Sequence, residues 1–231
     1  MRSMIKVFVC SVAALLACNL CAKEYQITRD FHKVVFIGNS ITKHGPSKEV
    51  DWSGNWGMAA SEAKKDYVHI VTAALTKKDK TPPATLVRNA AAFERGYMTF
   101  DMEKEMKDIF EFNSDLVIVA LGENVRAFKD DAQKAVFKKS LKDALLKIKE
   151  KSNPLIVIRS CFWAHKVKDE LLKEIAQEVG GRFVDMSNLC KDESNYARSE
   201  RDYSHKGVAG HPGDKGMQAI ADGIISCIAA Q

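Results

Sequence analysis

The feature of this sequence that most constrains its fold is a short apolar run that ends in a glycine and a serine. Residues 34–37 are four apolar residues in a row, and Gly38, Asn39 and Ser40 follow them directly. An apolar run of this length that stops at glycine is typical of a strand buried on both faces of a parallel sheet. In open α/β sheets, ligands bind just past the carboxyl ends of the strands. The pattern therefore predicts a central first strand over residues 33–37, with Ser40 at the edge where ligands bind.

Strand-like and helix-like segments alternate along the rest of the chain. Further strands are expected at residues 84–88, 116–121, 155–158 and 182–184, and helices at 58–75, 99–112, 130–151, 167–179 and 214–228. Strands that alternate with helices predict parallel βαβ units and a three-layer α/β/α sandwich. Because no internal repeat or second linker is present, we expect one domain over residues 23–231.

The first 22 residues have the pattern of an export signal. Arg2 and Lys6 accompany an apolar stretch, residues 5–16, that is too short to span a bilayer as a helix, and small residues follow it. Cleavage after Ala22 is one prediction. In the alternative, residues 15–18 act as a bacterial lipobox and Cys18 becomes a lipid-anchored N-terminus, which would be the chain's sole membrane attachment. The expected location is periplasmic, outer-membrane lipoprotein or secreted.

Charge and cysteine content exclude several classes of protein. The formal net charge is +5, or +3 without Arg2 and Lys6, and basic residues are interleaved with acidic ones. Because there is no basic arm and no aromatic-basic stripe, no nucleic-acid partner is expected. Cys161, Cys190 and Cys227 remain beyond the leader, and Cys161 with Cys190 is a possible disulfide. No cysteine or histidine spacing predicts a metal site.

Three polar residues follow or precede predicted elements at the same edge of the sheet. Ser40 follows the first strand, Asn124 follows the third, and His211 precedes the last helix. Pro212 restricts His211 to extended geometry, which keeps the imidazole outside a helix. A serine becomes a nucleophile when a base such as imidazole lies within reach. The set therefore predicts acyl transfer, unless Ser40 only caps a helix and the other two residues only form turns.

An oxyanion site is expected beside the nucleophile. The side-chain N–H of Asn124 and the backbone N–H groups of Ser40 and Glu94 are the candidate donors, because such groups stabilise the negative charge that develops on a carbonyl oxygen.

These motifs resemble those of the SGNH hydrolases, also called GDSL-type esterases and lipases. Residues 38–40 are similar to the first family block, with Asn39 where Asp is commonest. Residues 122–124 are similar to the Gly-x-Asn block, and His211-Pro212 to the last block. The resemblance implies a flavodoxin-like parallel sheet of about five strands, no metal or other cofactor, and ester hydrolysis by Ser40 and His211.

Two positions depart from the family pattern. Glu94 stands where the second block usually has glycine, and its carboxylate would oppose an oxyanion unless it points away or pairs with an arginine such as Arg88, Arg95 or Arg126. Val208 stands where an Asp usually orients the histidine. A backbone carbonyl is the expected substitute, and the other candidates are Asp202, His205, Asp214 and Glu94.

Aromatic residues near the predicted site indicate the substrate class. Trp52 and Trp56 lie in the polar segment 43–57 that follows Ser40, and Trp163 follows the fourth strand. Trp52 and Trp163 are expected to bind sugar rings, whereas Trp56 is expected to pack in the core. The predicted function is an exported serine esterase that removes acetyl or similar acyl groups from a glycan or a smaller ester. The alternatives are a glycan-binding protein without turnover, which Val208 favours, and an acyltransferase.

Overall fold

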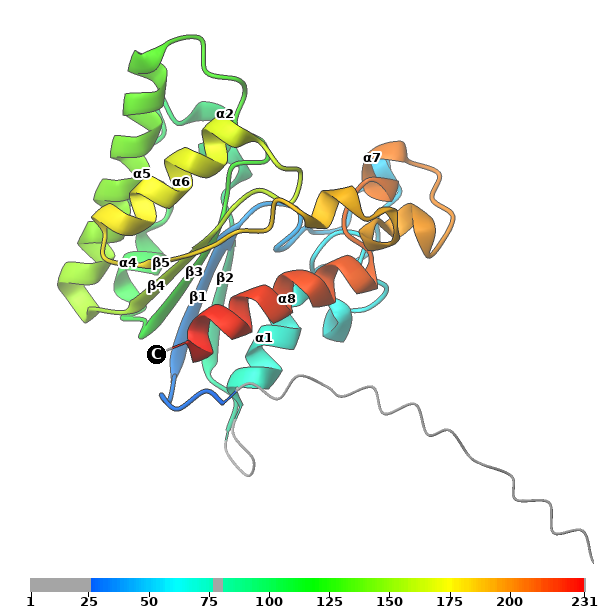
Figure 1. Cartoon of the computed structure of the whole chain (residues 1–231), viewed down its shortest axis with the longest axis horizontal. Helices are drawn as coiled ribbons and strands as arrows, with labels where there is room; N and C mark the ends of the chain where they lie inside the picture. Colours follow the sequence, from blue (N-terminus) through cyan, green and yellow to red (C-terminus); the bar gives the residue numbers. More distant parts are fainter. Residues whose placement is uncertain (1–25, 77–80, 231) are drawn as a thin grey trace, which may run out of the picture.

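Five parallel strands form one sheet, in the order β2-β1-β3-β4-β5 (Figure 1). The strands of this computed structural model are β1 (Lys33–Gly38), β2 (Ala84–Asn89), β3 (Leu116–Ala120), β4 (Leu155–Arg159) and β5 (Arg182–Val184). The structure describes residues 26–76 and 81–230, so the expected leader lies outside it. The order is the flavodoxin-like one, in which ligands bind where β1 and β3 diverge. The predicted fold class is confirmed.

The two central strands are buried on both faces. All five residues of β3 are buried, and in β1 only Lys33 is exposed. Helices cover both faces of a parallel sheet, so both sets of side chains in its central strands are apolar. Gly38, the last residue of β1, has no room for a side chain, because a Cβ there would lie 1.8 Å from Thr42 Oγ1. The turn that carries Ser40 therefore requires glycine at this position.

Helices lie in two layers, one on each face of the sheet (Figure 1). One layer contains α1 (Tyr67–Leu75) and α8 (Asp214–Ala229), and the other contains α2 (Ala91–Gly96), α3 (Met102–Glu105), α4 (Lys107–Glu111), α5 (Asp131–Ser152) and α6 (Lys166–Glu178). Each layer packs its apolar side chains against one face of the sheet. The predicted helices 130–151, 167–179 and 214–228 agree with α5, α6 and α8 to within one residue at each end.

Two predicted helices are shorter or divided. The helix expected over residues 58–75 begins only at Tyr67, because the buried Asp66 caps it by accepting from His69 N at 2.8 Å. Asp66 also accepts from Gly57 N at 2.9 Å, which holds the preceding segment outside the helix. The helix expected over residues 99–112 is divided at Met106, which lies between α3 and α4 with non-helical backbone.

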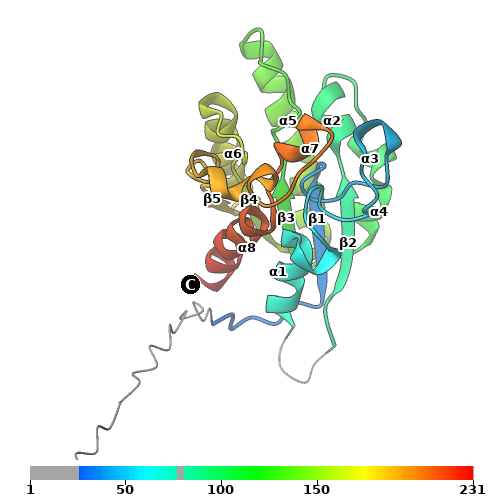
Figure 2. The same cartoon turned by 90° about the vertical axis from the view of Figure 1, so that its right-hand side faces the viewer.

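Two segments far apart in the sequence lie side by side at the carboxyl edge of the sheet (Figures 1 and 2). They are residues 43–61 and residues 189–213, the second of which contains α7 (Lys206–Ala209). Tyr203 donates from its hydroxyl to the carbonyl of Ala59 at 3.0 Å, and Ser204 donates to Asp51 at 2.6 Å. This contact brings the loop after Ser40 next to the loop that carries His211.

Two further expectations concern a disulfide and membrane-spanning helices. Cys161, Cys190 and Cys227 are all free thiols, so the possible Cys161–Cys190 pair is not formed. In the part of the chain that the structure describes, no helix has the length and apolar character needed to cross a membrane.

Candidate active site

Ser40 and His211 meet at the carboxyl edge of the sheet, although 171 positions separate them. Their Oγ and Nε2 atoms are 2.8 Å apart, and both residues are partly exposed. The other ring nitrogen, Nδ1, lies 2.7 Å from the carbonyl oxygen of Gly207. Because a carbonyl only accepts, Nδ1 carries the hydrogen and the lone pair of Nε2 faces the serine hydroxyl. The imidazole is therefore in the tautomer that can remove the proton of Ser40.

Backbone hydrogen bonds fix the loop that carries His211. Its N–H donates to the carbonyl of Val208 at 3.0 Å, and its carbonyl accepts from Ala197 N at 2.9 Å. The indole of Trp163 lies edge-on to the imidazole, with ring centroids 5.4 Å apart. These contacts position the imidazole of His211, and none of them involves a charged side chain.

No carboxylate hydrogen-bonds to His211 among the described residues, and Gly207 orients the ring instead. Val208 is buried beside Met58, Ala59 and Ala197. The other side chains considered for orienting His211 have different partners or face solvent. His205 caps α7, Asp214 accepts from Ser61, Glu94 accepts from Asn124, and Asp202 is exposed. Burial lowers the pKa of His211, although the bond to Gly207 and the charge of Glu123 act in the opposite direction.

Asn124 and Glu94 form a hydrogen-bonded pair, and Asn39, the residue before Ser40, donates to the same carboxylate. Nδ2 of Asn124 donates to Glu94 Oε2 at 2.7 Å. The other carboxylate oxygen, Oε1, accepts from Gly122 N at 2.6 Å, Asn39 Nδ2 at 3.2 Å and Asn124 N at 3.3 Å. The backbone N–H of Glu94, expected to face the oxyanion, instead donates to the carbonyl of Ala90 at 3.1 Å. This difference arises because α2 begins at Ala91, so the amide enters the helical ladder.

The Glu94 carboxylate has no hydrogen bond to an arginine among the described residues. Arg88 donates to Asp108 at 2.7 Å, and Arg95 donates to Asn124 Oδ1 at 3.4 Å. Glu94 is fully buried, and burial together with the charge of Glu123 raises its pKa.

A second buried carboxylate, Glu123, lies next to Glu94 and pairs with Arg159. Arg159 Nη1 lies 2.7 Å from Glu123 Oε1, and neither side chain has appreciable contact with solvent. Glu123 also accepts from Asn39 Nδ2 at 2.7 Å and Phe162 N at 3.0 Å. Burial alone would raise the pKa of Glu123, but the Arg159 guanidinium and these donors hold it below its usual value.

Neither Glu123 nor Arg159 was expected at the site from the sequence. Two signals were available. Glu123 is the variable residue of the Gly-x-Asn block, and Arg159 is a charged residue that directly follows the apolar run 155–158.

The three tryptophans have different surroundings. Trp163 is half-buried against His211 and Phe162. Trp52 donates from its indole to the carbonyl of His44 at 3.0 Å and packs edge-on against Trp56. Trp56 packs against the apolar core on the α1 and α8 side, as expected for it. Of the two residues predicted to bind substrate, Trp163 contacts His211.

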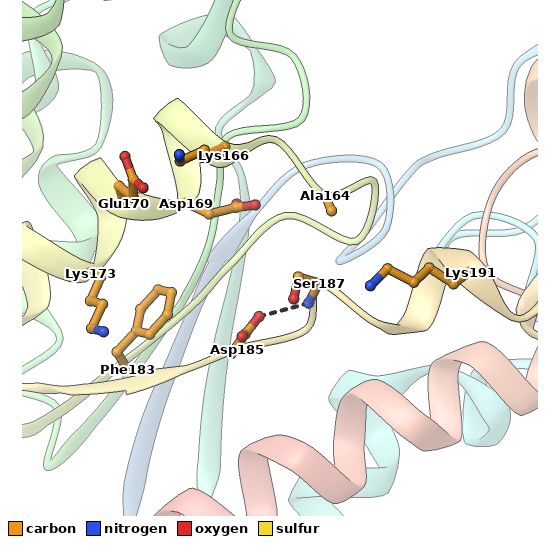
Figure 3. Close-up of a pocket in the computed structure, with 9 residues that line it drawn as sticks. All are labelled: Ala164, Lys166, Asp169, Glu170, Lys173, Phe183, Asp185, Ser187 and Lys191. Atoms are coloured by element: carbon orange, nitrogen blue, oxygen red, sulfur yellow. Dashed lines mark hydrogen bonds between the residues drawn. The ribbon is translucent and has the colours of Figure 1, made fainter.

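A separate hollow of about 450 Å³ lies where α6 faces β5 (Figure 3). Charged side chains of both signs line it, namely Lys166, Lys173, Lys191, Asp169, Glu170 and Asp185. Neither Ser40 nor His211 lines it. Within residues 26–76 and 81–230, no three His, Cys, Asp or Glu side chains are arranged so as to hold a metal ion.

Comparisons with known proteins identify the fold. Neither a protein-family model nor a curated protein sequence matches this chain. Among solved structures, a family two carbohydrate esterase from Cellvibrio japonicus matches with a TM-score of 0.51 and 14% identity, over 84% of this chain and 59% of that one.

An acetyl xylan esterase matches with a TM-score of 0.52 and 16% identity, over 84% of this chain and 98% of that one. A putative GDSL-like lipase from Bacteroides uniformis matches with a TM-score of 0.53 and 13% identity, over 84% and 93%. Carbohydrate esterases and GDSL-like lipases therefore share the architecture of this chain, which has the fold of the SGNH hydrolases.

Proposed function

We propose that this protein is an exported serine esterase that hydrolyses acyl esters, with acetyl esters of carbohydrate as its substrate class. The observation that carries the proposal is the 2.8 Å contact between Ser40 Oγ and His211 Nε2, with the Nδ1 hydrogen directed at Gly207. The fold neighbours that are carbohydrate or acetyl xylan esterases support the substrate class. Export is proposed from the leader pattern of residues 1–22.

The proposed reaction has two steps. His211 Nε2 takes the Ser40 proton as Oγ attacks the ester carbonyl, and the imidazolium then protonates the leaving alcohol. A water, deprotonated by the same imidazole, releases the acyl group as a carboxylic acid and restores Ser40. The backbone N–H of Ser40 and one N–H of Asn124 are the proposed donors to the oxyanion. Trp163, beside His211, is the proposed contact for a sugar ring, and Trp52 is proposed to bind the glycan further along the loop.

The test compares the mature protein with Ser40→Ala on 4-nitrophenyl acetate and on an acetylated xylo-oligosaccharide. We expect acetate release from both substrates by the wild type and none above background by Ser40→Ala. Ser61→Ala is a matched control, because it removes a hydroxyl that bonds to Asp214 and not to His211. Equal activity of wild type and Ser40→Ala would refute the proposal.

The second candidate function is glycan binding without turnover. The lack of a carboxylate on His211 among the described residues, together with the Glu94 carboxylate on Asn124, favours it. Saturable binding of a xylo-oligosaccharide with no Ser40-dependent acetate release would support this candidate over the esterase. If the wild type instead transfers acetyl to an added sugar, the acyltransferase alternative replaces hydrolysis.

A further inference from the structure

The side-chain amide of Asn124 has a hydrogen-bond partner at its nitrogen and another at its oxygen. Glu94 accepts from its Nδ2 at 2.7 Å, and Arg95 donates to its Oδ1 at 3.4 Å. A guanidinium can only donate and a carboxylate can only accept, so the two contacts allow one orientation of the amide. Because Glu94 is buried and Arg95 is exposed, the Glu94 contact is the stronger constraint.

One N–H of Asn124 remains available in this orientation. Nδ2 carries two hydrogens, and the bond to Glu94 uses one of them. The second N–H has no acceptor among the described residues. Gly38 pairs with Ala120 in the sheet, so the turns that follow these residues, with Ser40 in one and Asn124 in the other, lie next to each other. The remaining N–H therefore belongs to the turn that neighbours the nucleophile's turn, at the edge of the sheet where an oxyanion would form.

We propose that Glu94 is a positioning residue that orients Asn124 so that one amide N–H is presented to the oxyanion. The inference rests on the proposed esterase function. Glu94 itself does not touch the substrate; it acts through Asn124. Four donors reach its carboxylate, from Asn39, Gly122 and both nitrogens of Asn124, and they offset the negative charge that would otherwise oppose an oxyanion.

Glu94→Gln is the informative substitution because it keeps the shape and exchanges one acceptor for a donor. Gln can keep its carbonyl toward Asn39 and Gly122, but its amide group then faces Nδ2 of Asn124. Two donors cannot bond, so Asn124 must turn its carbonyl toward Gln. The turn removes the N–H from the site, and the loss of one oxyanion donor lowers kcat by about 10²–10³-fold.

The test is a double-mutant cycle on 4-nitrophenyl acetate. We expect kcat to fall about 10²–10³-fold in Glu94→Gln and in Asn124→Ala, with little change in KM. The double variant should be no slower than the slower single variant, because both changes remove the same N–H. Glu105→Gln, on the exposed surface of α3, is the matched control and should retain wild-type kcat.

Several results would overturn the inference. One is wild-type or higher activity in Glu94→Gln, which would mean that the carboxylate obstructs the site. Another is a double variant whose loss of kcat equals the product of the two single losses. A nuclear magnetic resonance measurement on the wild type is independent of variant folding and of turnover. We expect one Asn124 side-chain amide proton to be shifted downfield by the carboxylate and the other to be unshifted. Two ordinary shifts would overturn the positioning role, whereas loss of Ser40-dependent turnover would overturn only the esterase function.

Discussion

The loops that carry His211 and Asn124 differ in where their charged side chains lie. The loop with His211 holds the imidazole by a backbone carbonyl and an indole edge, and no carboxylate bonds to this ring within the described residues. The loop with Asn124 contains or contacts two buried carboxylates, Glu94 and Glu123. The resemblance to SGNH hydrolases implied the reverse, an acid near the histidine and a glycine near the asparagine. Buried charge therefore organises the expected oxyanion side of the site and not the base.

The largest effect on kcat should follow from removing Ser40 or His211. Ser40→Ala and His211→Ala should each lower kcat by at least about 10³-fold, because the serine proton has no other acceptor at hydrogen-bond distance among the described residues. The double variant should be no slower than either single variant, since the two residues act as a unit. Initial rates on 4-nitrophenyl acetate measure both effects. Further loss in the double variant would mean that the residues act separately.

A large effect on the free energy of unfolding is expected at the buried Glu123–Arg159 ion pair. Arg159→Met leaves the Glu123 charge without its buried partner and should lower the free energy of unfolding by about 3–5 kcal/mol. Arg88→Met is the matched control, because Arg88 and Asp108 are both partly exposed and such pairs contribute about 0–1 kcal/mol. Urea denaturation of the two variants measures the difference. Equal losses would show that the Glu123–Arg159 pair is no more important than a surface pair.

The pH dependence of kcat/KM tests whether His211 acts as the base without a carboxylate partner. His211 must be neutral to accept a proton, and burial lowers its pKa below that of free imidazole. The acid limb of kcat/KM should therefore lie at lower pH than the protonation of N-acetylhistidine in the same buffers. A pH series on 4-nitrophenyl acetate locates the limb. A limb above the N-acetylhistidine value would point to an unseen carboxylate partner for His211.

The sequence predicted the sheet, because buried parallel strands need uninterrupted apolar runs such as residues 34–37 and 116–121. It also predicted that Ser40 and His211 lie at the same edge, since both stand next to elements whose ends meet there. It did not predict the Glu94 network. A glutamate in an Ala-rich turn gives no sign of burial until α2 and the Gly122–Asn124 turn surround it with donors.

Boundaries that depend on a single side chain were also unpredictable. Residues 58–66 have the composition of a helix, but Asp66 accepts from both Gly57 and His69 and so separates the loop from α1. Competition of this kind depends on which backbone donors come within reach after folding, and no local pattern reports it.

The smallest effect concerns the indole of Trp163, which packs edge-on against the imidazole of His211. Trp163 contacts the imidazole by ring edges at 5.4 Å, and pairs of this type contribute about 0.5–1.5 kcal/mol. Trp163→Phe keeps a ring and should change kcat about twofold at most, whereas Trp163→Ala should lower kcat by roughly 3–10-fold. On an acetylated xylo-oligosaccharide, Trp163→Ala should also raise KM, because the same indole is the proposed sugar contact. A raised KM with unchanged kcat would assign Trp163 to substrate binding alone, and the Gly207 carbonyl would then suffice to orient the base.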